Sequence, residues 1–377
     1  MLKISRLFIS AVVSVGIVTI SSPSLSQKIE YEDGVRIVHN DKPLWGKNPK
    51  VALEFVRQIG VFEGPDENYM FYLPTDIAKD TDGNLYVMDA GNYRVQKFDP
   101  DMKYLATFGR QGQGPSEFSS FPYSINLDEE GNIYIDDHDG RQIQILTPEG
   151  KEIKRIRFSG RSNPFRLSGS GLIIRPYWNS ISYIDDEIER GFKMSNQVVG
   201  LYDKNGLLIK ELGKIHDFKD INITVSANLN YIEVDSNDNI YLSFVYQNRI
   251  EKYSHEGKLL WKADRPLNYK LSYKLEEIKR EMPDGSIYKY FSSKFTGVST
   301  DIEIDHKGRI WLRTITKQGG EGEKYEFELE IFDNDGILLG RIPLPEKTGL
   351  HMRIFDDRLF FIGDETMFIY EYKIIEK

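Results

Sequence analysis

The 377-residue chain contains no cysteine. It therefore cannot form disulfide bonds, and it cannot be a lipoprotein anchored through a cysteine. Without such covalent support its stability must come from a large hydrophobic core, which 22 tyrosines and 21 phenylalanines help to supply. A chain of this length usually divides into two domains unless a repeat lets one domain grow.

Long apolar runs are also scarce, and the one at the N-terminus is short. Lys3 and Arg6 precede a charge-free run over residues 7–20, and the small-residue stretch "SSPSLS" follows. This is the layout of a secretory signal, whose apolar part is shorter than the roughly 20 residues of a membrane-spanning helix. We expect residues 1–26 to be a cleaved signal peptide; the alternative is an uncleaved anchor. The mature chain is then exported, periplasmic or secreted, with no membrane insertion.

The sequence lacks an excess of positive charge and the common catalytic signatures. Its net charge is −9, and loss of Lys3 and Arg6 with the signal would make it −11. A net negative charge of this size argues against nucleic acid as a partner, because the phosphate backbone is also negatively charged. There is no G-x-S-x-G or H-E-x-x-H motif, and the six histidines are scattered along the chain.

The stretch "DTDGN" at residues 80–84 raises the question of a calcium loop. An EF-hand loop needs its glycine at position 6 and a bidentate glutamate at position 12. Counted from Asp80, the glycine is at position 4 and position 12 is Gly91. The following "NLYVMD" alternates as a half-buried strand does. The pattern therefore predicts a hairpin turn in which the Asp80 carboxylate accepts hydrogen bonds from turn amides.

The same pattern recurs along the chain. The stretch at residues 73–99 matches later segments after shifts of 48, 155 and 225 residues, and two weaker copies lie near residue 170 and at the C-terminus. The turn aspartate recurs in three of these copies, as Asp128, Asp235 and Asp305. Each clear copy reads as four short strands. Six units of this kind, repeated every 40 to 50 residues, are typical of a β-propeller.

The chain ends predict how the ring closes. The last copy stops after its third strand, while "ALEFVRQIG" near the N-terminus resembles the fourth strand of the first clear copy. We therefore expect a lead-in segment over residues 27–50 and an all-β, six-bladed propeller over residues 51–377. The strand at residues 51–60 should complete the last blade and remove an exposed edge.

The repeat resembles a known family. The pattern is similar to the NHL repeat in nine positions and in the stretch "FGRQGQGPSEF" that follows them. The nine positions are Pro74, Asp80, Gly83, Asn84, Tyr86, Asp89, Asn92, Arg94 and Gln96. The resemblance implies a propeller of the exported bacterial six-bladed type. It specifies no single function, because NHL-type propellers include protein- and RNA-binding scaffolds, and similar exported propellers include metal-dependent lyases and lactonases.

Three insertions interrupt the repeat. Residues 179–196 lie between the second and third strands of the third blade, and residues 317–324 form a Gly-rich loop in the fifth. Residues 266–297 lie between blades four and five, and within them Leu271, Leu275, Ile278 and Met282 share one helical face. This spacing predicts a short helix. Such long loops either shape a binding mouth or cover a blade edge.

Equivalent positions of the first strands should gather around the central channel. Apolar residues between them, such as Ile77 and Ile125, should pack between blades. The two polar positions of each first strand are expected to line the channel: Asp76, Ser124, Asn163, Tyr231, Asp301 and His351 in one slot, and Asn126, Glu233, Glu303 and Arg353 in the other. Carboxylates from several blades suit Ca²⁺ or Mg²⁺, and the alternative is a wet channel with paired charges.

Two functions follow from this reading. The favoured one is an exported module, expected to be monomeric, that binds a protein, peptide or glycan, because no nucleophile or acid–base pair stands out. The alternative is a metal-dependent lyase or lactonase. In that case Ca²⁺ or Mg²⁺ would be held by Asp76, Glu233, Asp301 and Glu303. No other cofactor is indicated.

Overall fold

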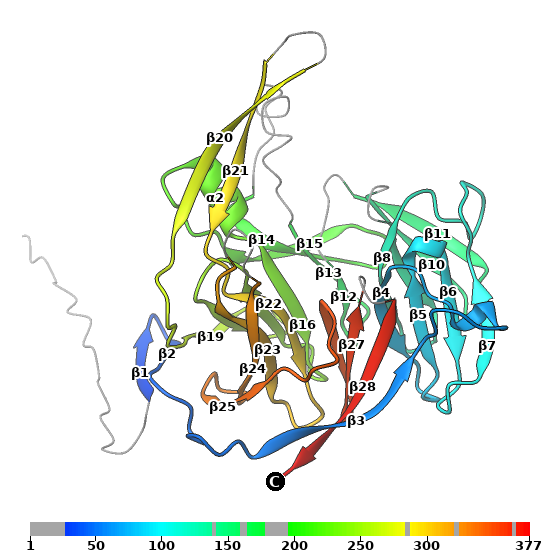
Figure 1. Ribbon diagram of the computed structural model, residues 1–377. Helices are drawn as coiled ribbons and strands as arrows, with labels where there is room; N and C mark the ends of the chain where they lie inside the picture. Colours follow the sequence, from blue (N-terminus) through cyan, green and yellow to red (C-terminus); the bar gives the residue numbers. More distant parts are fainter. Residues whose placement is uncertain are drawn as a thin grey trace, which may run out of the picture.

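The computed structural model describes residues 27–137, 141–158, 164–177, 195–282, 287–319, 324–363 and 367–377. These residues form an all-β ring of six four-stranded antiparallel blades (Figure 1). The first three blades are β4 (Pro74–Lys79), β5 (Leu85–Asp89), β6 (Arg94–Phe98) and β7 (Tyr104–Phe108); β8 (Pro122–Leu127), β9 (Ile133–Asp137), β10 (Gln142–Leu146) and β11 (Glu152–Arg157); and β12 (Arg166–Leu167), β13 (Ile173–Pro176), β14 (Gln197–Tyr202) and β15 (Leu208–Lys214).

The remaining blades take strands from both ends of the chain. They are β16 (Asn230–Val234), β17 (Ile240–Phe244), β18 (Ile250–Tyr253) and β19 (Leu259–Asp264); β22 (Ser299–Ile304), β23 (Ile310–Lys317), β24 (Glu326–Phe332) and β25 (Leu338–Pro343); and β26 (His351–Phe355), β27 (Arg358–Gly363), β28 (Phe368–Glu376) and β3 (Val51–Ile59). β3 pairs with β28 throughout, from Ile59 opposite Ile369 to Val51 opposite Glu376. The N-terminal part of the chain thus supplies the outer strand of the last blade.

The repeated aspartate closes a turn in blade after blade. Asp80 Oδ1 accepts hydrogen bonds from the backbone nitrogens of Asp82 (3.1 Å) and Asn84 (2.8 Å). Gly83 has φ +85°, a left-handed conformation that glycine adopts without strain. Asp128, Asp235 and Asp305 bind the amide four residues on in the same way. The hairpin-turn interpretation of "DTDGN" is therefore confirmed.

The core lies between blades. Each pair of neighbouring blades encloses its own cluster of buried apolar side chains. The residues expected to pack between blades do so, since Ile77 and Ile125 are fully buried in two such clusters. A single domain can grow to this length because every added blade buries a further face.

The lead-in segment does more than connect. β1 (Gln27–Glu32) and β2 (Val35–Asn40) form a hairpin, and β2 pairs in parallel with β19, which makes blade four six-stranded. Asn40 then links two blades, since its Nδ2 donates to the carbonyls of Asp264 (2.8 Å) and Gly336 (3.0 Å). Its Oδ1 accepts from the Leu338 nitrogen at 2.8 Å.

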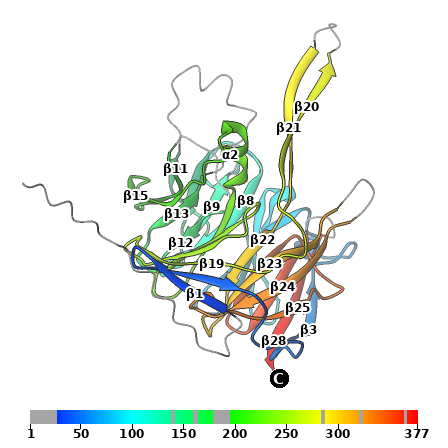
Figure 2. The same cartoon turned by 90° about the vertical axis from the view of Figure 1, so that its left-hand side faces the viewer.

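The helix predicted over residues 271–282 is wrong. This segment contains β20 (Tyr273–Glu281), which pairs in register with β21 (Ile287–Phe295). The two strands project from the ring as a two-stranded arm (Figures 1 and 2). Four apolar residues at helical spacing favour a helix in this segment. The aromatic-rich segment at residues 287–295 favours a strand, and its pairing with β20 prevails. The sequence between the two strands, which contains Pro283 and Gly285, is also typical of a turn.

A short helix lies on the same face of the ring as the arm. α2 (Ile221–Ala227) follows blade three and is capped by Asp220, whose carboxylate accepts from two helix nitrogens. In the described residues, no helix has the length and apolar character needed to cross a membrane. Asn163 and most of the insertion predicted at residues 179–196 lie outside the described part of the chain, as does the centre of the loop at 317–324.

Candidate functional site

The first strands of the six blades bring the predicted channel residues together around the ring axis. In the first five blades, the residue five positions before the turn residue with positive φ falls in a common slot. In the sixth blade, whose turn is shorter, Arg353 opposite Phe360 occupies this slot. Its members are Ala78, Asn126, Arg166, Glu233, Glu303 and Arg353. Arg166 was not predicted, because only the turn of the third copy is well preserved. The spacing from Gly171 to Arg166, which equals that from Gly83 to Ala78, could have revealed it.

Arg166 is the centre of this set, which we call the axis ring. Its Nε lies 2.6 Å from Glu233 Oε2, and its Nη2 lies 3.2 Å from Glu303 Oε1. Arg353 is the second cation, with Nε 3.7 Å from both Asp76 Oδ1 and Glu303 Oε1. The carboxylates therefore face two buried guanidinium groups.

Each carboxylate also accepts backbone hydrogen bonds, several of them from the next blade. Asp76 Oδ2 accepts from the Ile125 nitrogen at 3.0 Å, which joins blades one and two. Asp301 Oδ2 and Glu303 Oε2 accept from the Met352 and Ile354 nitrogens at 2.8 and 2.9 Å, which joins blades five and six. These bonds hold the innermost strands together, because each satisfies a buried amide that faces a neighbouring blade.

Burial sets the protonation of this group. It raises the pKa of Asp301, and together with the neighbouring Glu233 carboxylate it holds the pKa of Glu303 well above the usual range. Burial also opposes ionisation of Glu233, but the Arg166 and Arg353 guanidinium groups and the Val234 amide together outweigh it and lower the pKa of that carboxyl. Burial thus opposes ionisation of Asp301 and Glu303, whereas the neighbouring guanidinium groups favour ionisation of Glu233.

The four carboxyl groups do not fit a Ca²⁺ or Mg²⁺ ion. Every one of their oxygens already accepts a hydrogen bond from a backbone amide or from Arg166. The Arg166 and Arg353 guanidinium groups lie beside these carboxylates, and their positive charges would repel a metal cation. Across the described segments, no group of three or more His, Asp or Glu side chains could hold a metal. The arrangement corresponds to the alternative of paired charges.

The other predicted channel residues lie nearer the end of the axis where the first strands begin, which we call the mouth. The Tyr123 hydroxyl on β8 and His351 Nε2 on β26 are 2.9 Å apart, and both side chains are half-buried. Burial and then the Asp301 carboxylate raise the pKa of the nearby Tyr231. Ser124 is fully buried, and its hydroxyl has no hydrogen-bond partner among the described residues.

A further buried acid was not predicted. Asp136 on β9 lies opposite Ser124 and faces blade three, where Arg175 stacks on the Phe158 ring at 3.7 Å. Burial raises the pKa of Asp136 to about 7; the Arg175 charge lowers it and the Asp137 charge raises it. This carboxyl titrates near neutral pH.

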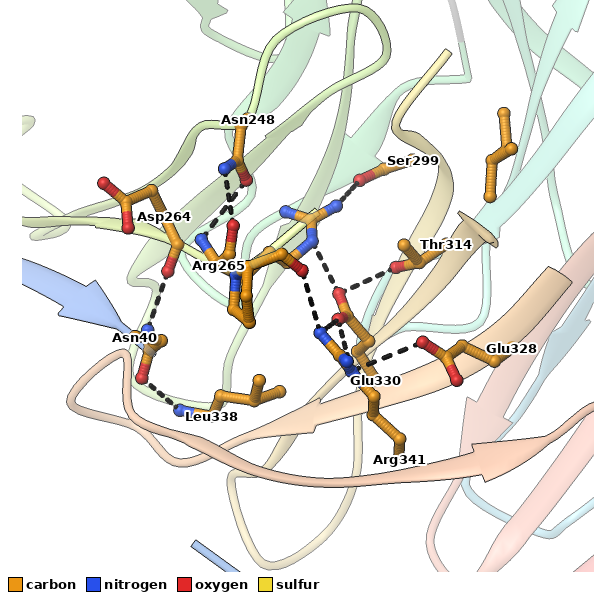
Figure 3. A network of polar contacts seen from close by, with 12 residues as sticks. Asn40, Asn248, Asp264, Arg265, Ser299, Thr314, Glu328, Glu330, Leu338 and Arg341 are labelled. Carbon is orange, nitrogen blue, oxygen red and sulfur yellow. Dashed lines mark hydrogen bonds and ion pairs between the residues drawn. The ribbon is translucent and has the colours of Figure 1, made fainter. Parts of the chain in front are cut away.

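A second polar network was also missed, at the root of the arm (Figure 3). Arg265 follows β19 and is fully buried, with Nε 2.5 Å from Glu330 Oε2 and a hydrogen bond to the Ser299 hydroxyl. Glu330 also accepts from Thr314 Oγ1 at 3.0 Å and from Arg341. The network fixes blade five to the start of the chain segment that leads into β20.

Comparisons with known proteins agree with this architecture. The family model for the NHL repeat matches residues 71–98. Among curated proteins, none matches.

Several solved structures are similar in fold. A member of the DUF4221 family from Bacteroides vulgatus is 11% identical, with a TM-score of 0.55, and the match covers 87% of this chain and 99% of that one. A candidate exported protein from Bacteroides fragilis is 11% identical, with a TM-score of 0.54 and coverage of 87% and 96%. The virginiamycin B lyase of Staphylococcus aureus is 12% identical over 86% of this chain and 100% of its own, with a TM-score of 0.48. The chain is a six-bladed β-propeller, and residues 71–98 match the NHL repeat.

Proposed function

We propose that this propeller is an exported binding module that takes a protein, peptide or glycan ligand at its mouth. The proposal rests on a difference between the polar groups deep in the ring and those at the mouth. Deep in the ring the carboxylates hold blades together, whereas at the mouth the Tyr123–His351 pair is half-exposed. A hydroxyl and an imidazole of this kind can both donate and accept hydrogen bonds, which suits a polar ligand.

The positions of the inserted segments also support the mouth as the face that binds the ligand. The arm and α2 both lie in connections that lead from one blade to the first strand of the next. They therefore rise on the side of the ring where the first strands begin (Figure 1). A rigid scaffold with loops grouped on one face is a common arrangement for binding. Export itself rests on the signal-like layout of residues 1–26.

The alternative of a metal-dependent lyase or lactonase has less support. Its four proposed ligands, Asp76, Glu233, Asp301 and Glu303, are occupied by amides and by Arg166. At the mouth His351 and Tyr123 are hydrogen-bonded to each other, whereas nucleophilic catalysis needs a nucleophile whose base is in turn oriented by a third group. Binding is therefore the function that the geometry favours.

The test uses the mature chain from Gln27 on a glycan array and on an immobilised peptide library. We expect a ligand class to be retained, and the Tyr123→Phe and His351→Gln variants to bind it roughly tenfold more weakly, as for loss of one hydrogen bond. His306→Gln is the matched control, because His306 lies in a turn after β22, at the opposite end of the axis. Equal binding by the mouth variants, or no binding of any probe by wild type, would count against the proposal.

A further inference from the structure

The arm formed by β20 and β21 has a firm base and an uncovered outer part. At the base, the Tyr273 hydroxyl donates to the Tyr246 carbonyl at 2.7 Å, and Tyr273 and Phe295 pack edge to face. The Tyr269 hydroxyl donates to the Ile315 carbonyl at 2.9 Å and so fixes the incoming chain to blade five. Beyond this base, the side chains of β20 are exposed or half-buried.

An isolated two-stranded ribbon of this kind is only marginally stable in water, and a third strand or a packed face is usually needed. β20 pairs with β21 along one edge, and within the described part of the chain no strand pairs with its other edge. Free edges of this kind are templates for pairing with another strand. The arm therefore presents an edge for strand addition.

The sequence of β20 indicates which strand fits that edge. Residues 276–280 read Glu-Glu-Ile-Lys-Arg, so acidic and basic residues are mirror images about Ile278. If two copies pair antiparallel about a two-fold axis at Ile278, Glu276 lies opposite Arg280 and Glu277 lies opposite Lys279. Ile278 lies opposite itself. Each opposite-charge pair occurs twice, because a two-fold interface repeats every contact.

We propose that the partner of this edge is a second copy of the same chain, joined through β20 into a four-stranded sheet of two arms. The monomer expected from the sequence is thereby replaced by a weak, reversible dimer. The interface is short, so it belongs to the small, transient class rather than to obligate dimers.

Neighbouring registers are disfavoured, which makes the pairing specific. A two-fold axis perpendicular to the sheet keeps each side chain on the same face of the sheet. Directly opposite residues of an antiparallel pair must also share a face, so the axis has to pass through a residue and cannot pass between two residues. An axis at Glu277 would set that residue opposite its own copy, and an axis at Lys279 would do the same for the lysine. Like charges directly opposite each other are destabilising.

The other strand of the arm fits a second copy less well. Within residues 287–295, β21 carries lysines at positions 289 and 294 and no acidic residue. Two copies of β21 would bring together only positive charges. Charge complementarity therefore selects β20.

A charge-reversal series measured by sedimentation velocity tests the proposal. Wild type should dimerise at low salt at roughly 100 µM, and about 0.5 M NaCl should weaken the dimer by screening. Arg280→Glu or Glu276→Arg alone should weaken it at least tenfold, because each places like charges opposite each other twice. Glu276→Arg combined with Arg280→Glu should restore it. A wild type that stays monomeric, or single variants that dimerise as wild type does, would overturn the proposal.

The absence of cysteine permits a second test of the register. In the proposed pairing, Ile278→Cys places two thiols opposite each other, and diamide would oxidise them to one disulfide while it is reduced to its hydrazine. Lys274→Cys is the control, since its two copies would lie about 27 Å apart at 3.4 Å per residue. Rapid cross-linking of the first variant only is expected; equal cross-linking of both, or none, would contradict the register.

Discussion

The blades and the arm are made of the same antiparallel strands, but they differ in what covers their faces. All five residues of β5, β9, β10 and β17 are buried between neighbouring blades, whereas β20 is exposed along most of its length. The ring gains stability by stacking, and its axis carboxylates hold neighbouring blades together through backbone hydrogen bonds. The arm has little packing of its own, so its exposed edge is available for a partner. The comparison separates the part of the chain that holds the fold from the part that serves recognition.

We expect the largest loss of stability when a blade of the ring loses its outer strand and is left with an unpaired edge like that of the arm. Removing residues 51–59 takes β3 away from β28 and leaves the last blade with an unpaired outer edge. We expect an unfolded or aggregated product, measured by size-exclusion chromatography and thermal unfolding. Removing residues 27–32 is the control, because β1 is the outermost strand of its sheet and, among the described strands, pairs with β2 alone. A stable monomer without β3 would show that ring closure is dispensable.

The same exchange made in the ring and in the arm sharpens the comparison. Glu330→Gln leaves the buried Arg265 without its counter-charge, which costs about 3–5 kcal/mol of the free energy of unfolding. Glu276→Gln in the arm removes only a loose 3.8 Å contact with Lys294, so we expect a change within about 0.5 kcal/mol. Urea unfolding of both variants measures the difference. Equal losses would mean that ring and arm are stabilised alike.

A smaller, pH-dependent effect should come from Asp136. Its folded pKa of about 7 lies above the unfolded value, so the folded state binds the proton more tightly. The stability that it contributes is present at low pH and is lost as the pH rises from about 4 to 7. Between pH 5 and 8 the loss should be about 2–3 kcal/mol, at 1.36 kcal/mol per pKa unit.

Asp136→Asn should remove this part of the pH dependence. The measured quantity is the difference in unfolding free energy between pH 5 and pH 8, in the variant and in wild type. At pH 5 the Asp136 carboxyl is protonated and, like the asparagine amide, uncharged, so the variant and wild type should differ mainly at pH 8, where only wild type carries the buried charge. An unchanged pH dependence would contradict the raised pKa.

Much of the fold could be predicted because the repeat is encoded locally. Asp80 and Gly83 specify a turn by their own hydrogen bonds and φ angle, so the blades can be counted along the chain. The register of these turns also puts the four carboxylates on first strands, where they contact Arg166 or backbone amides of the next blade. Features that a single repeat unit defines were accessible from sequence.

Side-chain networks that join distant segments were not accessible. Arg265 and Glu330 are 65 positions apart and meet only when blade five docks on the chain that leaves blade four. Arg166 pairs with Glu233 and Glu303 from two other blades, and without it the carboxylates resembled a metal site. The arm was misread because a helical spacing within one segment says nothing about the strand that pairs with it.

The central claim is that the axis carboxylates hold blades together and do not bind metal. The most direct test is the melting temperature of the purified mature protein in EDTA, in Ca²⁺ and in Mg²⁺. The account predicts the same melting temperature in all three, and the Glu233→Gln, Asp301→Asn double variant should melt lower by the same amount in each. A wild-type melting temperature that rises with metal, falls with EDTA and loses this response in the double variant would contradict it, because only a native-state metal site raises stability in this way.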